Sequence, residues 1–129
     1  EININKKNKK IRIGSHGVNH ISLSKELSSQ KIYNELFESK CILSKITKTK
    51  INKLSLPNGI YCKKTLDIAR DLNYYYVFSS KRASNRSKES NKTINRFVIT
   101  KNTTLLMILA AYTGMLDQIQ DFKKMIYEL

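Results

Sequence analysis

Hydrophobic and polar positions follow two different periods along the first third of this chain. Residues 11–13 alternate and stop at Gly14, which predicts a short strand. Residues 24–46 carry apolar side chains at helical spacing, and Ser24 is the predicted N-cap of this long helix. Its apolar positions are Ile32, Tyr33, Leu36, Phe37, Cys41 and Leu43. Cys41 is expected to be a small core residue rather than a ligand.

The alternation of strand and helix continues downstream. Residues 51–56 predict a second strand, and residues 74–79, rich in tyrosine, have the highest strand propensity in the chain. Between them we expect a turn at residues 57–59 and a short helix at residues 65–72 that ends at Asn73. Further along, the sequence predicts a polar loop at residues 80–93 and a strand at residues 97–99. A helix capped by Thr103 or Thr104 is then expected to run toward Leu129, with a break near Gly114. This order indicates parallel β-α units and hence an α/β fold.

Three polar segments follow directly after predicted strands. They are residues 15–20, residues 57–59 and the pair Ser79-Ser80. In parallel sheets and barrels, the working groups gather at the carboxyl ends of the strands. We therefore expect these segments, which are distant in sequence, to share one rim of an active site.

The composition is that of one globular domain. The chain has 129 residues, of which 40% are hydrophobic and 26% charged. We predict a polar lead-in at residues 1–10 and one domain at residues 11–129. No signal peptide is visible, and the longest apolar run, residues 105–116, is too short to span a bilayer. Localisation and oligomeric state stay open at this point.

The basic charge of the chain bears on its partners. A formal net charge of +14 favours nucleic acid, an anionic membrane or an acidic glycan. The 24 basic residues are 19 lysines and 5 arginines, whereas recognition of phosphates and bases favours arginine. The sequence also offers no reading helix and no aromatic stacking sheet. We therefore favour a solvated lysine surface and expect no specific nucleic-acid partner.

His16 and His20 are the two histidines of the chain. Their spacing of four can direct both imidazoles at one point, as a zinc ion requires. Neutral imidazole also suits other divalent metals, so the spacing does not choose the metal. Two surface or capping histidines are the competing interpretation of the pair when it is considered without its neighbours.

The residues around the pair strengthen the metal interpretation. Residues 14–24, Gly-Ser-His-Gly-Val-Asn-His-Ile-Ser-Leu-Ser, resemble the second motif of the NodB-type polysaccharide deacetylases, carbohydrate esterase family 4. Residues 54–59, Leu-Ser-Leu-Pro-Asn-Gly, resemble the third motif of that family, whose Pro-x-Gly turn lines the active-site groove. Residues 66–79 resemble the helix and strand that follow this turn. The three motifs occur in the order and at the spacing of the family.

The resemblance implies a partial, distorted (β/α) barrel that removes N-acetyl or O-acetyl groups from a carbohydrate. In the family, two histidines and an aspartate hold a divalent metal, usually zinc, which activates water for hydrolysis. His16 and His20 match the metal histidines. Pro57, Asn58 and Gly59 match the turn that binds substrate.

Part of the family's machinery has no counterpart in this sequence. The paired aspartates belong upstream of the histidine motif, and residues 1–13 contain no aspartate. No histidine follows His20, so the usual general acid is absent, and the arginine expected near Ser55 is replaced. The substitute carboxylates that we considered are Glu26, Asp67 and Asp71. None is placed by the sequence at the strand edge, so no catalytic residue is identified.

Two histidines alone hold zinc poorly, because catalytic sites normally use three protein ligands. We therefore expect a weakly held or absent metal and little deacetylase activity from these residues. The first alternative is a non-catalytic module that binds a glycan without hydrolysing it, aided by the basic loop at residues 81–92 and by residues 74–76. The second, favoured by charge alone, is a basic nucleic-acid-binding protein.

Overall fold

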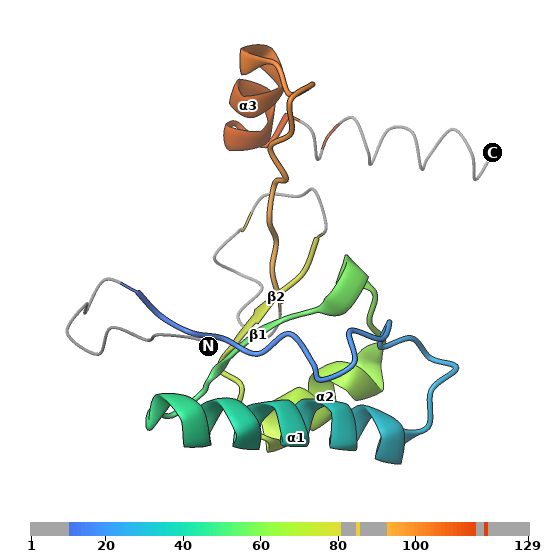
Figure 1. The fold of residues 1–129 in the computed structure, drawn as a ribbon. Coiled ribbons are helices and arrows are strands. Elements are labelled where there is room, and N and C mark those ends of the chain that lie inside the picture. The colour runs from blue at the N-terminus through green and yellow to red at the C-terminus, as the bar shows by residue number, and fades with distance from the viewer. Residues whose placement is uncertain (1–10, 81–84, 86–92, 116–117, 119–129) are drawn as a thin grey trace. The chain divides into compact units, whose positions relative to one another are not determined.

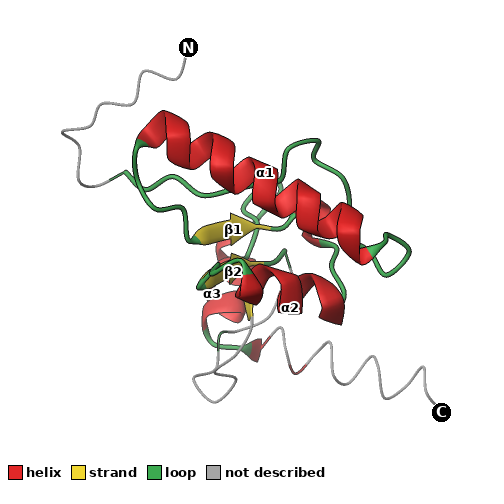
Figure 2. Cartoon of the chain, turned by 90° about the horizontal axis from the view of Figure 1, so that it is seen from below, coloured by secondary structure: helices red, strands yellow, loops and turns green. Residues whose placement is uncertain are grey.

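The computed structural model describes residues 11–80, 85, 93–115 and 118. The chain divides into two compact units, Glu1–Phe78 and Ser79–Leu129. In the first unit, the parallel strands β1 (Lys53–Ser55) and β2 (Tyr76–Phe78) have helices α1 (Ser29–Thr47) and α2 (Lys63–Asp71) on one side (Figures 1 and 2). The predicted boundary between a lead-in and a domain falls at the edge of the described residues and stays a prediction.

Helix α1 begins later than the sequence predicted. Its N-cap is Ser28, whose hydroxyl accepts a hydrogen bond from the backbone N–H of Lys31 at 3.2 Å. The prediction that Ser24 caps this helix is wrong, because the chain makes a turn there in which Leu27 N–H bonds to the Ser24 carbonyl at 3.4 Å. A serine cap is effective in either place, since its oxygen satisfies a free amide of the first helical turn. Sequence alone did not separate the two serines.

The prediction of a strand at residues 11–13 is wrong, because those residues have no regular structure. The segment instead pairs with β1 just beyond them, at a parallel bridge between Ser15 and Leu54. Ser15 N–H donates to the Lys53 carbonyl, and Ser55 N–H donates to the Ser15 carbonyl, each at 2.8 Å. Strand β1 thus lies between this N-terminal segment and β2, and all three run in the same direction. The parallel β-α arrangement expected from the sequence is confirmed.

A turn and a helix connect β1 to β2. Strand β1 leads into the 3-10 turn η1 (Pro57–Gly59), and α2 follows with Cys62 as its N-cap. The chain then leaves α2 through Asn73, whose φ of 59° is left-handed as expected for this residue type. In the β1–β2 pair, Leu54 lies opposite Val77.

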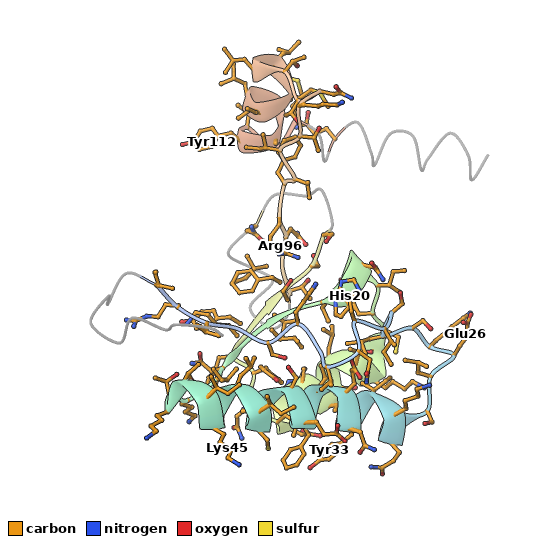
Figure 3. The ribbon with its side chains drawn as sticks, in the orientation of Figure 1. His20, Glu26, Tyr33, Lys45, Arg96 and Tyr112 are labelled. Atoms are coloured by element: carbon orange, nitrogen blue, oxygen red, sulfur yellow. The ribbon has the colours of Figure 1, made fainter. Side chains whose placement is uncertain are left out.

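The core of the first unit lies between the strands and the two helices. Its buried apolar residues are Leu23, Ile32, Leu36, Ile51, Leu54, Leu56, Ala69, Tyr74 and Val77. Burial raises the pKa of Tyr74 above its usual value, and its hydroxyl donates to the Leu36 carbonyl at 2.9 Å. The prediction that Cys41 is a core residue is wrong, since it lies on the exposed side of α1. Tyr33 and Lys45 also point away from the strands (Figure 3).

The second unit contains strand β3 (Thr93–Ile94) and helix α3 (Leu105–Tyr112). The Thr104 hydroxyl accepts from Met107 N–H at 3.3 Å, which confirms Thr104 as the cap, and Gly114 has a left-handed φ of 77°. The prediction of a strand at residues 97–99 is wrong, because those residues have no regular structure. Strand β3 lies earlier, at Thr93–Ile94. The basic loop at residues 81–92 lies outside the described residues except for Asn85. Within the part of the chain described, no helix is both long and apolar enough to cross a membrane.

Candidate functional site

His16 lies at the carboxyl end of the N-terminal segment, where that segment contacts β1. Its Nδ1 lies 2.8 Å from the carbonyl oxygen of Ser55. A carbonyl oxygen can only accept, so Nδ1 donates this hydrogen bond and Nε2 is the ring nitrogen left for a ligand. Histidines that bind metals commonly have this arrangement, in which one nitrogen is fixed by the protein and the other is free.

His20 places its imidazole beside that of His16. The two ring centroids are 4.8 Å apart with an interplanar angle of 69°. Both side chains are exposed to solvent, and His20 has a left-handed φ of 55°. A non-glycine residue in this region is uncommon, and such conformations are concentrated at functional sites. The two rings are therefore available together to a ligand from solvent.

The turn between the histidines is attached to α1 by polar side chains that are buried. Glu35 accepts hydrogen bonds from the backbone N–H groups of Val18 and Asn19 and from the Asn19 side chain. Ser39, one helical turn further along, lies 2.8 Å from the hydroxyl of Ser15. Helix α1 thus contributes to the site as well as to the core.

Glu35 and Ser39 were missed by the sequence analysis. A signal for them exists, because both fall on the stripe of α1 that also carries Ile32 and Leu36. Polar residues on the buried stripe of an amphipathic helix are unusual, and when buried they are hydrogen-bonded. Their position could have identified them as partners of a neighbouring segment.

The predicted substrate-binding turn lies next to the histidine segment. Asn58 has a φ of 55°, and its side-chain amide donates to the Ser22 hydroxyl at 3.0 Å. Pro57 is buried beneath the turn, whereas Asn58 is exposed and Gly59 is half-buried. Two of the three rim segments predicted from the sequence are therefore linked, Asn58 through Ser22 and His16 through Ser55. Ser79-Ser80 belongs to the second unit, so its place on this rim stays a prediction.

The histidine pair has the donor chemistry and the accessibility that a divalent metal needs, but it supplies two protein ligands. Among the described residues, no group of three or more histidine, cysteine, aspartate or glutamate side chains could hold a metal ion. Asp67 lies 3.3 Å from Arg70 on α2, and Glu26 lies on the loop before α1, apart from His20 (Figure 3). The substitute carboxylates are therefore not assembled with the histidines in the part of the chain that the structure describes.

The polysaccharide deacetylase family model matches residues 4–77, which is more than half of the chain. The chain therefore belongs to the polysaccharide deacetylase family. The matched range contains the histidine segment, the turn at Pro57–Gly59 and most of β2. A comparison with curated proteins finds no match.

Solved structures are similar to this chain over part of its length. The Streptococcus pyogenes deacetylase PplD, in complex with acetate, is 26% identical with a TM-score of 0.67, over 76% of this chain and 43% of its own. A mutant of BA3943 described as a CE4 family pseudoenzyme with restored enzymatic activity is 22% identical with a TM-score of 0.50, over 54% and 25%. Wild-type BA3943 from Bacillus anthracis is 23% identical with a TM-score of 0.49, over 51% and 23%.

The chain spans less than half the length of each of these proteins. Its α/β fold, with a parallel sheet, is thus part of a (β/α) barrel of the polysaccharide deacetylase type. This agrees with the fold class and the family that the sequence predicted.

Proposed function

We propose that this chain provides the two-histidine part of the metal site of a carbohydrate deacetylase. The substrates would be N-acetyl or O-acetyl groups on a polysaccharide or glycan, and zinc is the metal we expect. His16 and His20 bind the metal, and the turn at Pro57–Gly59 contacts the sugar. When bound, the metal supplies Lewis-acid polarisation of the acetyl carbonyl and activation of a water molecule.

The observation that carries this proposal is the hydrogen bond from His16 Nδ1 to the Ser55 carbonyl at 2.8 Å. This bond fixes the His16 ring against β1 and leaves Nε2 for a ligand. The His20 ring lies beside it, with 4.8 Å between the ring centroids. The family membership supports the same role, because the histidine segment lies within the matched residues.

The residues on this rim have separate tasks in the proposed reaction. Ser55 holds the His16 ring through its backbone carbonyl, and Ser22 holds the Asn58 side chain at the edge of the turn. Asn58 is exposed, so its remaining amide oxygen is available to accept a hydrogen bond from a sugar hydroxyl. No proton-transferring residue is assigned among the described residues, and we expect little acetate release from the chain alone.

Zinc binding to the full chain, measured by isothermal titration calorimetry, tests the proposal. We expect one zinc per chain with an affinity weaker than micromolar, because two imidazoles are fewer ligands than a stable site uses. The variant His16→Ala/His20→Ala is expected to lose this binding completely. Binding that survives in the double variant would contradict the proposal, and sub-micromolar binding lost in it would contradict the expectation of a weak site.

The non-catalytic alternative shares the rim but needs no metal. A glycan-binding module would bind an acetylated oligosaccharide equally well with and without zinc and would release no acetate from it. A salt-sensitive mobility shift with arbitrary oligonucleotides would instead favour the nucleic-acid alternative. These two measurements separate the alternatives from the deacetylase proposal.

A further inference from the structure

The backbone between the two histidines is held by one side chain of α1. Glu35 Oε1 accepts from Val18 N–H at 2.8 Å and from Asn19 N–H at 2.6 Å, and Oε2 accepts from Asn19 Nδ2 at 2.9 Å. We propose that Glu35 is the positioning residue of the histidine pair, whose carboxylate sets His16 and His20 side by side before a metal binds. This inference rests on the proposed function. It assigns to Glu35 the task of ordering the turn, which is separate from binding the metal.

Gly17 allows the turn to approach the Glu35 carboxylate closely. Gly17 has a left-handed φ of 79°, and a Cβ added to it would lie 2.8 Å from Glu35 Oε1. Glycine is the residue that tolerates both this φ and this contact. The turn is therefore shaped around the glutamate, and its path from His16 to His20 depends on that side chain.

The position of Glu35 is costly for a purely structural residue. The residue is 4% exposed and lies on the stripe of α1 between Ile32 and Leu36, where a leucine would add to the core. Burying a carboxylate is unfavourable unless its oxygens are hydrogen-bonded. Among the described residues the ion pair found is Arg70–Asp67, so the donors that satisfy Glu35 are those of the turn. The carboxylate stabilises the turn because the turn provides the donors.

The histidine segment is thus fixed by two different elements. Ser55 of β1 fixes the ring of His16, and Glu35 of α1 fixes the backbone that leads from His16 to His20. Groups that orient metal ligands typically contribute about 10–100-fold to metal affinity. Without Glu35, zinc binding must also order the turn. Loss of Glu35 is therefore expected to weaken zinc affinity by about 10–100-fold.

The experiment compares three variants of the full chain. Glu35→Met removes the acceptors at similar side-chain length. Glu35→Gln keeps one acceptor oxygen for both backbone amides, and the Asn19 side chain can reverse its amide to match. Glu38→Met is the matched control, because Glu38 is an exposed residue on the same helix. Amide hydrogen exchange by NMR, without metal, is measured at Val18 and Asn19, and zinc affinity is measured by calorimetry.

In Glu35→Met we expect exchange at Val18 and Asn19 to become at least about tenfold faster while the amides of β1 keep their rates. Zinc affinity falls by about 10–100-fold. In Glu35→Gln most of the protection and affinity return, and Glu38→Met matches the parent chain. If Glu35→Met does not fold, Glu35→Gln carries the test, with the amide protons of Val18 and Asn19 shifting upfield as a charged acceptor is replaced by a neutral one.

Unchanged exchange at Val18 and Asn19 in Glu35→Met would overturn the inference. So would faster exchange spread evenly over the core, because a general stabilising role predicts that pattern. The proposed function fails separately, if the parent chain binds no zinc. In that case the exchange rates still decide whether Glu35 positions the turn.

Discussion

Replacement of Leu54 by alanine is expected to lower the free energy of unfolding by about 2–5 kcal/mol. Leu54 is fully buried at the middle of β1, where it forms the bridge to Ser15 and lies opposite Val77 of β2. The substitution leaves a cavity between the strands and the helices, and the cost includes lost burial as well as lost contacts. Urea unfolding followed by circular dichroism measures the change.

The matched control for this prediction is Ile42→Ala. Ile42 is an apolar residue of similar size on α1, but its side chain is 49% exposed. About half of its surface stays in water, so the loss of unfolding free energy should be well below that of Leu54→Ala, at about 0.5 kcal/mol. Equal losses in the two variants would show that the core is not where the structure places it.

Replacement of Gly17 by alanine is expected to disrupt the histidine turn at a cost of about 1–3 kcal/mol. The new Cβ would meet Glu35 Oε1 at 2.8 Å, and the φ of 79° is unfavourable for any side chain. Either the turn or the glutamate must move, so zinc affinity should fall together with stability. Urea unfolding and zinc calorimetry on the same variant measure both effects.

Val18→Ala is the control for the turn. Val18 is the next residue, its side chain is exposed, and its contribution to the turn is a backbone N–H that alanine keeps. Stability and zinc affinity should match those of the parent chain. A loss in Val18→Ala as large as that in Gly17→Ala would contradict the role assigned to the backbone of this turn.

Much of the first unit could be predicted from its sequence, because local signals and the family motifs agree there. The turn at Pro57–Gly59 and the left-handed Asn73 follow from residue types whose backbone preferences are strong. The parallel pairing of β1 and β2 follows from the alternation of strand and helix. The turn and the left-handed residue depend on local preferences, whereas the strand pairing joins residues distant in sequence and follows from the order of the elements.

The wrong predictions for the helix cap, Cys41 and β3 have a different origin. Ser24 and Ser28 are equally good caps, and the choice between them depends on the turn in which Leu27 bonds back to Ser24. Cys41 is exposed because it lies two residues after the buried Ser39, and residues two apart lie on nearly opposite sides of a helix. The position of β3 was also missed, since short strands have weak local signals.

The hydrogen bonds of Glu35 are long-range, and spacing rules for metal ligands do not include them. They join a helix to a turn that lies sixteen and seventeen residues earlier in the chain. The sequence singled out the histidines from their spacing together with the motif residues around them. The helical stripe could have marked Glu35 as a buried polar residue, but its partner in the turn was visible only in the structure. Residues that hold a site are harder to predict than its ligands for this reason.

The central claim is that His16 and His20 bind one metal ion together. The most direct measurement is long-range nitrogen–proton NMR of the two imidazoles while zinc is added to the full chain. Before zinc, we expect His16 to carry its proton on Nδ1, where it bonds the Ser55 carbonyl. With zinc, His16 Nε2 and one ring nitrogen of His20 should shift along a single saturation curve, and His16 Nδ1 should stay protonated. A shift confined to one histidine, or two curves with different midpoints, would contradict a shared metal.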